Sequence, residues 1–368
     1  MLSEEVKKKR EQFIQDLVEA NYTSYIVITH PKYSAKSAFR FSESPVSMAS
    51  PYSWKYKDAK KRLLELGEIL TPEEAERRNI NFANPSLKKD IPGATLPTLR
   101  GGIQLLKPGE RAYTHRHTAS AFRFILEAPV EGAYTVVEGT KIPMLPGDLI
   151  LTPNWVWHDH HNEGSSNAIW FDGLDAIVAF WIGAGFYQEF DEVSKEAYQP
   201  VLQDADFISN NYGAGLLPEK TILPDHIPRI DNPLLYYPYA AVRKSLMNLA
   251  NSSATNDRLV LHYVNPTTGK STFPSMATRI RLVRANGDSG WFRRTENVVY
   301  ITMEGNLTFE LKNGQKFETE PYDVTAIPSW TEYHVVNTSG KPAIYFAYSD
   351  RPIFEYLGLF REDRKANK

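Results

Sequence analysis

The segment Tyr-Thr-His-Arg-His at residues 113–117 gives the clearest indication of how this chain folds. Its β-branched and aromatic surroundings favour a strand, in which alternate side chains share one face. His115 and His117 are therefore expected to point to one side, and Arg116 to the other. A third histidine, His158, lies on a later segment that would return beside the first. Three imidazoles brought together in this way predict a metal site inside a β-barrel.

The alternative is that these histidines are ordinary interior residues, because a single buried histidine is more often hydrogen-bonded in a core than bound to a metal. The spacing of His115 and His117 favours ligands instead. Gly147 and Pro153 precede His158 where a barrel needs turns, which supports the same interpretation. Three other histidines fit no such pattern and are interpreted as structural: His30, His226 and His262.

From about Pro97 the chain consists of short runs rich in β-branched and aromatic residues, separated by Gly and Pro. This pattern predicts a sandwich or a closed antiparallel barrel. It then recurs: residues 134–139 resemble residues 309–314, and residues 151–162 resemble residues 326–337, both 175 positions later. Two matches at one offset predict two related barrels.

We expect a mainly β protein in four parts. An N-terminal helical arm covers residues 1–92, with helices at about 3–20, 57–69 and from Pro72 onward. A metal-binding barrel at 93–185 is followed by a connecting segment at 186–272, which has one helical stretch near 240–250. A second barrel, without a metal, occupies 273–368.

Composition excludes several classes of protein. The 368 residues predict more than one domain, and 42 basic against 44 acidic residues give a net charge of −2, so no nucleic-acid or membrane surface is expected. The absence of cysteine excludes disulfides and thiolate ligands. The N-terminus is too charged for a signal peptide, and the most apolar stretch, 176–187, is too short for a membrane helix. We expect a cytoplasmic protein.

The spacing of Gly109, the two histidines of the first strand, Gly147, Pro153 and His158 resembles the two motifs of the cupin superfamily. Many metal-binding cupins also carry a glutamate ligand shortly after the first histidine pair, and here that place holds Ala121 or Phe122. The ligand set is therefore three neutral imidazoles, which leave the charge of a divalent ion for an anionic substrate to neutralise. Imidazole ligation alone would permit zinc, manganese, nickel or copper as well as iron.

Several further stretches resemble the gentisate 1,2-dioxygenase family, which includes salicylate and 1-hydroxy-2-naphthoate dioxygenases. These stretches are Glu76–Arg78, Ala83–Pro85, Gly102–Gln104, His115–His117, Ala121–Phe124, Trp155–His160, Trp170–Asp175 and Asn265–Gly269. The resemblance implies an iron(II) enzyme that uses dioxygen to cleave an ortho-hydroxybenzoate between its carboxyl-bearing and hydroxyl-bearing carbons. It also implies a homo-oligomer, with a tetramer expected.

The resemblance further implies roles for individual residues, with His115, His117 and His158 as iron ligands. Gln104 and Arg123 would lie beside the substrate carboxylate, and Arg77 would close the pocket. His160 would hydrogen-bond the substrate hydroxyl or bound oxygen, with Asp172 orienting it. Two alternatives stay open: Arg123 could form a salt bridge at the barrel rim, and Arg77 could be a solvated helix residue.

Two departures from the family bear on the substrate. Arg100 stands where relatives usually carry Tyr or Trp, and the polar Asn79 follows the double arginine. Both are expected to line the pocket, where an added cation would favour a more polar or doubly anionic ring. The alternative is that Arg100 points out of the barrel and pairs with a surface carboxylate.

The second barrel lacks the histidine pattern. Residues 291–294, Trp-Phe-Arg-Arg, occupy the neighbourhood of the first strand, Tyr333 matches His158, and His334 is one position out of register. We expect this barrel to be structural, with aromatic residues in its core. Two rival functions remain: another cupin metalloenzyme, such as an isomerase or a decarboxylase, or a non-catalytic binding protein with two barrels.

Overall fold

The computed structural model describes residues 3–25, 44–75, 77–191, 197–216, 232–252 and 259–364. The chain forms two units, residues 1–46 and 47–368. The first unit contains helix α1 (Glu4–Glu19), which begins where the Oγ of Ser3 accepts a hydrogen bond from the Val6 amide. The presence of an N-terminal helix is thus confirmed. Among the described residues, no helix has both the length and the apolar character needed to span a membrane.

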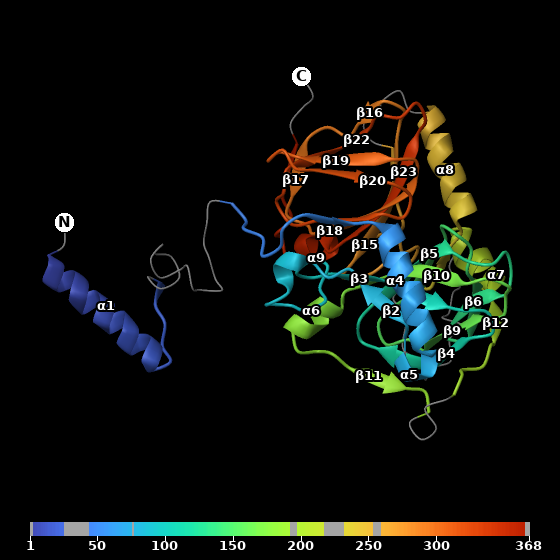
Figure 1. The fold of residues 1–368 in the computed structure, drawn as a ribbon, viewed down its shortest axis with the longest axis horizontal. Coiled ribbons are helices and arrows are strands. Elements are labelled where there is room, and N and C mark those ends of the chain that lie inside the picture. The colour runs from blue at the N-terminus through green and yellow to red at the C-terminus, as the bar shows by residue number, and fades with distance from the viewer. Residues whose placement is uncertain are drawn as a thin grey trace. The chain divides into compact units, whose positions relative to one another are not determined.

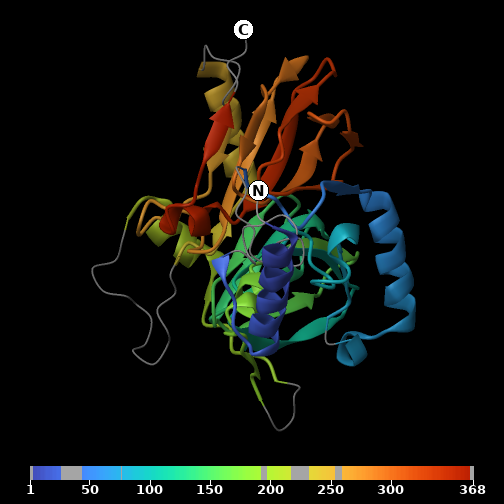
Figure 2. The same ribbon diagram turned by 90° about the vertical axis from the view of Figure 1, so that its left-hand side faces the viewer.

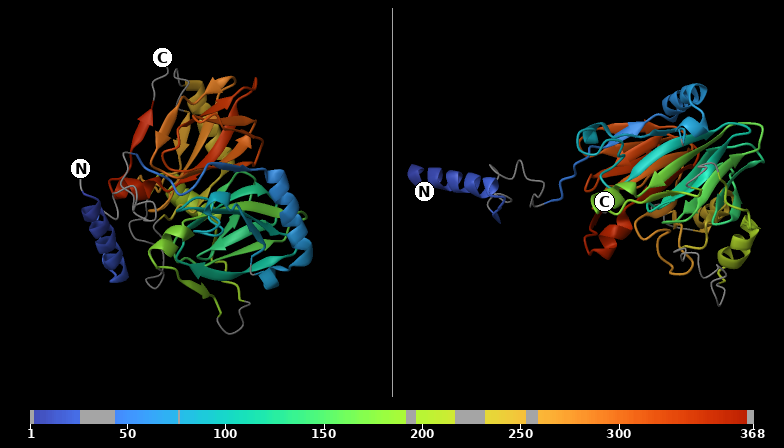
Figure 3. Two further views of the ribbon diagram at one scale, coloured as in Figure 1. Left: turned by 60° about the vertical axis from the view of Figure 1, so that its left-hand side comes forward. Right: turned by 90° about the horizontal axis from the view of Figure 1, so that it is seen from below.

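The second unit contains two β-barrels that lie side by side in every view (Figures 1, 2 and 3). The first barrel has two six-stranded sheets, ordered β13-β8-β5-β10-β3-β2 and β11-β4-β9-β6-β7-β12. Its strands are β2 (Asn79–Asn81), β3 (Arg100–Leu106), β4 (Arg111–His117), β5 (Ala121–Glu127), β6 (Ala133–Val137), β7 (Thr140–Pro143), β8 (Leu149–Thr152), β9 (His158–Asn162), β10 (Ala168–Leu174), β11 (Tyr187–Glu189), β12 (Gln203–Asp204) and β13 (Tyr236–Tyr237).

The second barrel repeats this plan, with sheets ordered β1-β21-β18-β23-β15-β14 and β20-β19-β22-β17-β24, and with β16 paired to β22. Its strands are β1 (Tyr52–Trp54), β14 (Val260–His262), β15 (Ala277–Val283), β16 (Gly287–Asp288), β17 (Phe292–Arg294), β18 (Val298–Glu304), β19 (Leu307–Leu311), β20 (Lys316–Thr319), β21 (Val324–Ile327), β22 (Tyr333–Asn337), β23 (Ala343–Ser349) and β24 (Glu362–Arg364).

Helices cover the outside of the barrels. Helix α4 lies along the first barrel (Figure 2) and α8 along the second (Figure 1). The helices are α4 (Tyr56–Ile69), α5 (Pro72–Ala75), α6 (Ala176–Trp181), α7 (Ala205–Ile208), α8 (Tyr239–Ser252) and α9 (Arg351–Tyr356), with short turns at η1 (Pro85–Leu87) and η2 (Ser209–Gly213). The helices predicted at 57–69 and 240–250 are therefore confirmed to within two residues of their ends.

The two predicted barrels are confirmed, and the repeat extends to the residues that shape them. Strand β22 begins 175 residues after β9, and Asn337 on β22 repeats the contacts of Asn162 on β9. Asn162 donates to the carbonyls of Leu106 and Ser166, and Asn337 donates to three carbonyls at the matching place in the second barrel. The boundaries at 92, 185 and 272 stay predictions.

An aromatic layer joins the barrels. Phe124 of β5 stacks on Phe346 of β23 with 4.2 Å between ring centroids, and Phe122 meets Phe346 and Tyr348 edge-on. These rings are all essentially inaccessible to solvent. Burial of this much apolar surface is the main force that holds the barrels together. A separate aromatic cluster that includes Tyr300, Phe309 and Tyr333 fills the interior of the second barrel, as expected.

Each barrel also caps the helix that precedes the other barrel. The Tyr56 amide at the start of α4 donates to Asp323 in the second barrel at 2.8 Å, and the Tyr239 amide at the start of α8 donates to Asp148 in the first, also at 2.8 Å. Neither cap comes from the helix's own flanking residue. Strands cross between the barrels in the same way. Strand β1, which precedes the first barrel, pairs with β21 of the second, and β13, which precedes the second barrel, pairs with β8 of the first.

This crossed capping predicts a loss of stability when either carboxylate is removed. Asp148→Ala and Asp323→Ala should each lower the free energy of unfolding by about 1–2 kcal/mol, the usual cost of losing a helix cap. Chemical denaturation followed by circular dichroism measures this change. Asp90→Ala, at an exposed carboxylate, is the control. If the two cap variants unfold at the same denaturant concentration as Asp90→Ala, the caps do not stabilise the protein.

Candidate metal centre

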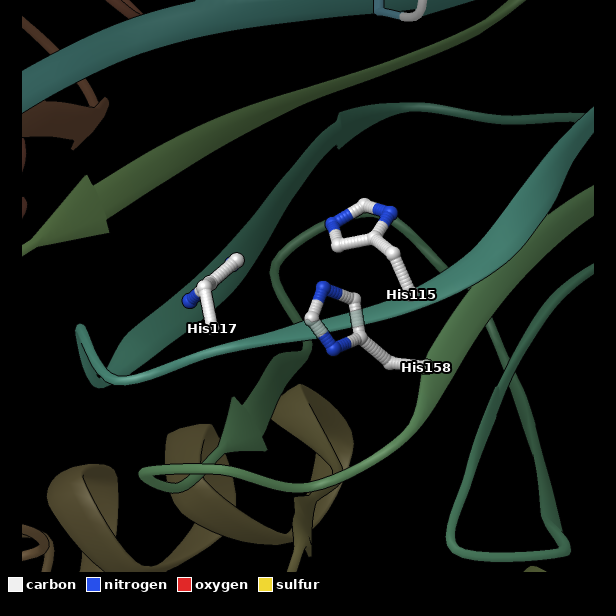
Figure 4. A group of neighbouring side chains, drawn as sticks. All are labelled: His115, His117 and His158. Atoms are coloured by element: carbon white, nitrogen blue, oxygen red, sulfur yellow. The ribbon is translucent and has the colours of Figure 1, made fainter. Parts of the chain in front are cut away.

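Three histidines meet inside the first barrel (Figure 4). His115 and His117 extend from β4, and His158 extends from the neighbouring strand β9. One nitrogen from each ring lies within 4.8 Å of the others. The pairing of β4 with β9 shifts register between Ala112 and His115, and this irregularity brings His115 directly opposite His158. The metal-site geometry predicted from the strand spacing is present.

Backbone carbonyls orient the three rings and fix which nitrogen two of them present. The Nδ1 of His117 contacts the Ala119 carbonyl at 2.8 Å, and that of His158 contacts the Val156 carbonyl at 3.0 Å. His115 hydrogen-bonds the carbonyl of Tyr113. In His117 and His158, a proton on Nδ1 satisfies the carbonyl and leaves Nε2 with its lone pair available to a metal.

The charge state of the rings also suits a metal. Burial lowers the pKa of His115 and His158 well below the usual value and that of His117 to about 4. The rings are therefore neutral at pH 7, which is the form of imidazole that ligates metals. The residues present fit a divalent ion such as iron(II).

The facing sheet carries the polar residues expected to bind a substrate. Asp172 on β10 pairs with Gly102 on β3 and with Arg123 on β5, and Trp170 pairs with Gln104. Because paired residues share a face, these side chains lie on one side of the sheet. Gln104 is buried, yet its side chain hydrogen-bonds no other residue in the described part of the chain. Its amide is therefore available to a ligand.

Arg123 is the buried cation of this face. Its Nε lies 3.2 Å from the Nε2 of His160, and its Nη1 contacts the Thr152 hydroxyl. Burial lowers the pKa of Arg123 to about 10, so the group remains a cation at pH 7. No carboxylate within the described residues forms a salt bridge with Arg123, which argues against the alternative of a rim ion pair and leaves its charge for an anionic ligand.

His160 and Asp172 are linked differently from the expectation. They form no direct hydrogen bond in the described chain. Trp170 contacts both, since its Nε1 donates to Asp172 at 3.0 Å and its ring packs against His160 at 4.8 Å. The Nδ1 of His160 is buried and has no partner there. Burial raises the pKa of Asp172 to about 6, although the positive charge of Arg123 acts to lower it.

The remaining predicted residues lie around this group. Arg77 is half-buried, and its Nη2 donates to the Tyr113 carbonyl at 2.8 Å and contacts the His115 ring, so it is not simply a solvated helix residue. The Nε of Arg100 donates to Asn81 at 3.0 Å, and its charge acts on the Asp172 carboxyl. Asn79 is exposed and pairs with Gln104 across the sheet.

Sequence reasoning assigned no role to four neighbours of the site: Asn81, Thr152, Trp170 and Tyr187. Only the register of strands that are distant in sequence brings these residues to the site. Of the other singled-out residues, His30, His226 and Glu76 lie outside the described residues. His262 and the stretch Asn265–Gly269 line a separate cavity of about 750 Å³, whose lining does not include the three ligands.

In the second barrel, different residues occupy the ligand positions. Phe292 pairs with Tyr333 as His115 pairs with His158, and Arg294 takes the place of His117. Arg294 donates to the buried Glu296 at 2.9 Å, and Arg279 binds the same carboxylate. His334 points elsewhere, stacking on Trp291 at 4.0 Å. An ion network therefore stands where the first barrel has its histidines.

The geometry predicts different consequences for two histidines on β9. His158→Ala should abolish metal binding, as should His115→Ala, because two imidazoles hold a divalent ion poorly. His160→Ala should keep its metal and turn over at least about 10²-fold more slowly, the usual scale of acid–base assistance. Metal analysis after gel filtration, together with kcat, checks both. Metal loss in His160→Ala with retention in His158→Ala would mean that the two roles are exchanged.

Comparisons with known proteins agree with this site. Residues 102–175 match the model of the cupin domain. The chain is 34% identical over 323 residues to gentisate 1,2-dioxygenase 1 of Aquipseudomonas alcaligenes, covering 87% of this chain and 88% of the relative. It is 30% identical over 356 residues to 5-aminosalicylate 1,2-dioxygenase of a Comamonas species, covering 96% and 89%.

A solved structure extends the similarity to three dimensions. Salicylate 1,2-dioxygenase from Pseudoaminobacter salicylatoxidans, in adducts with gentisate, superposes with a TM-score of 0.81 at 25% identity. The match covers 100% of this chain and 96% of that chain. With the histidine centre, these similarities identify the chain as a ring-cleaving dioxygenase, and it belongs to the gentisate and salicylate 1,2-dioxygenase family.

Proposed function

We propose that this dioxygenase binds iron(II) through His115, His117 and His158 and cleaves an ortho-hydroxybenzoate between its carboxyl-bearing and hydroxyl-bearing carbons. The observation that carries the proposal is a single barrel in which three neutral imidazoles face a sheet with a buried guanidinium that forms no salt bridge with a carboxylate of the described residues. An iron(II) ion held there would supply open coordination positions for a chelating substrate and for dioxygen. The protein's own residues bind and orient the aromatic acid.

The polar residues of the facing sheet divide this work. Arg123 and Gln104 bind the substrate carboxylate, since a guanidinium and an amide offer donors that match its oxygens. Arg77, which already touches the His115 ring, closes the pocket over the acid. His160 hydrogen-bonds the oxygen of the substrate hydroxyl through its Nδ1, because Arg123 already donates to its Nε2 and Nδ1 has no other partner in the described chain. Asp172 orients this histidine through Trp170.

The substrate class follows from the charge of the pocket. Arg77, Arg100 and Arg123 all act electrostatically on one carboxyl, that of Asp172. Three cations beside one acid favour a ring that carries a polar or anionic substituent besides the chelating pair. Asn79 adds a polar side chain at the margin. The similarity to a 5-aminosalicylate dioxygenase supports a polar substituent.

We further propose that the protein works in the cytoplasm as a homo-oligomer, with four subunits the expected number. A chain without cysteine suits a reducing compartment. Exposed apolar side chains after each barrel's last long strand, among them Trp181, Ile182 and Leu357, support contacts with further subunits.

Metal dependence is the first test of the proposed function. Protein reconstituted with iron(II) should hold about one iron per chain and consume oxygen with a panel of hydroxybenzoates, whereas zinc-loaded protein should not. Metal analysis and an oxygen electrode measure both. Two irons per chain would contradict the single site. Conversion of substrate without oxygen uptake would favour an isomerase or a decarboxylase instead.

The second test concerns Arg100 and the choice of substrate. Arg100→Trp removes a cation and restores an aromatic ring, so kcat/KM should shift toward unsubstituted salicylates and away from rings with a polar or anionic substituent. The expected change is about 1–3 kcal/mol, comparable with the loss of one charge-assisted hydrogen bond. Kinetics with gentisate and salicylate measure the ratio. A ratio within twofold of the parent value would remove Arg100 from the pocket.

A further inference from the structure

Strand β11 is an edge strand of the histidine-bearing sheet, and its register decides where its side chains point. Tyr187 pairs with His117, and Gln188 pairs with Arg116. Tyr187 therefore lies on the side of the metal ligands and Gln188 on the opposite side. The Tyr187 ring stacks on His115 with 5.3 Å between centroids, yet 49% of the residue is still exposed. An aromatic ring thus lies against a ligand at the margin of the site.

The Arg116 side chain hydrogen-bonds this edge strand on the outer face of the sheet. Its Nε and Nη2 donate to the Oε1 of Gln188 at 2.9 and 2.6 Å. The guanidinium also lies over the rings of Trp155 and Trp157, 4.5 and 4.3 Å from their centroids. The two tryptophans belong to the turn that leads into His158. One side chain therefore ties together β4, β11 and the turn before the third ligand.

The second barrel repeats this clamp in the absence of the three histidines. Arg293 lies over Trp330 at 4.7 Å and donates to Asp363 of β24 at 3.0 Å. Trp155 and Trp330 share a left-handed backbone, with φ of 61° and 64°. The clamp is thus a feature of the repeat, and the barrels differ in what it holds in place.

The residue of the clamped strand that pairs with His117 in the first barrel, or with Arg294 in the second, differs between the barrels. In the second barrel this residue is Glu362, which pairs with Arg294 at 2.6 Å. Strand β24 is therefore held by two ion pairs. In the first barrel the corresponding residue is Tyr187, and on the outer face Arg116 contacts the neutral amide of Gln188. The two clamps therefore differ in chemistry, because the second barrel joins its strands by charged pairs and the first barrel joins Arg116 to an amide.

We propose that Arg116 is a positioning residue of the metal site: through Gln188 it holds β11 so that Tyr187 covers His115 and forms one wall for the aromatic acid. The part that concerns the substrate rests on the proposed function. The part that concerns the strand does not, because it follows from contacts within the protein. Arg116 itself touches neither ligand nor substrate, since it points to the outer face.

The strand is tested first in metal-free protein, by hydrogen exchange of the amides of residues 187–189. Arg116→Lys keeps the charge but loses the planar group that both stacks and donates twice. Exchange should rise about tenfold or more in Arg116→Lys and in Gln188→Ala, the scale of a lost hydrogen bond or cation–π contact. Unchanged exchange in both variants would overturn the proposal.

The wall is tested with metal-loaded protein and a hydroxybenzoate. Arg116→Lys should raise KM about tenfold, with kcat within about threefold of the parent and the same metal content. Tyr187→Ala should raise KM by a similar factor. If Arg116 acts through Tyr187, the double variant should be no worse than Tyr187→Ala alone. Multiplying effects on KM would overturn the proposal.

The second barrel supplies the matched control. Arg293→Lys makes the same change in the equivalent clamp, so it should raise exchange in β24 and leave KM unchanged. An equal rise of KM in Arg293→Lys would show a general loss of stability and overturn the proposal. A parent that cleaves no hydroxybenzoate would contradict the proposed function alone, and the exchange measurements would then decide the clamp by themselves.

Discussion

The alternation of side chains along β4 and β9 is the constraint on which the site depends. It turns His115, His117 and His158 toward the barrel interior, and it turns Arg116 outward to where two tryptophans hold it. A shift of one residue in either strand would reverse these faces. Backbone carbonyls within two residues of each ligand then fix the ring orientation, so the same strands that supply the ligands also aim them.

The charge states of the site residues also favour the binding of a metal and an anionic substrate. The ligands are neutral because burial depresses their pKa values, while the facing sheet keeps Arg123 charged and unpaired by any carboxylate of the described chain. A pocket of this kind is costly to leave empty, since a buried cation lacks the solvation that water would give it. An acidic aromatic substrate supplies the missing negative charge. The three histidines and Arg123 therefore serve both metal binding and substrate binding.

The second barrel shows how far a repeat can diverge while its framework persists. Phe292, Arg294 and Tyr333 replace the three ligands, and Glu296 satisfies two buried guanidinium groups. Such a network can be stable only because every charge in it has a partner. The framework survives in the asparagine contacts of β9 and β22 and in the crossed caps. The crossed caps and the aromatic layer hold the second barrel against the first.

The sequence by itself determined the two barrels, the three ligands and the family, because all three depend on local spacing: a period of two within a strand and one offset between repeats. Through resemblance it also singled out Gln104 and Arg123, which lie on one face of the sheet opposite the histidines. Only the tertiary structure decided the exchange of β1 and β13, the role of Trp170 between His160 and Asp172, and the packing of Tyr187 on His115. The reason is physical. Strands of two or three residues are too short to show a period, and their partners are chosen when distant segments close the barrels together.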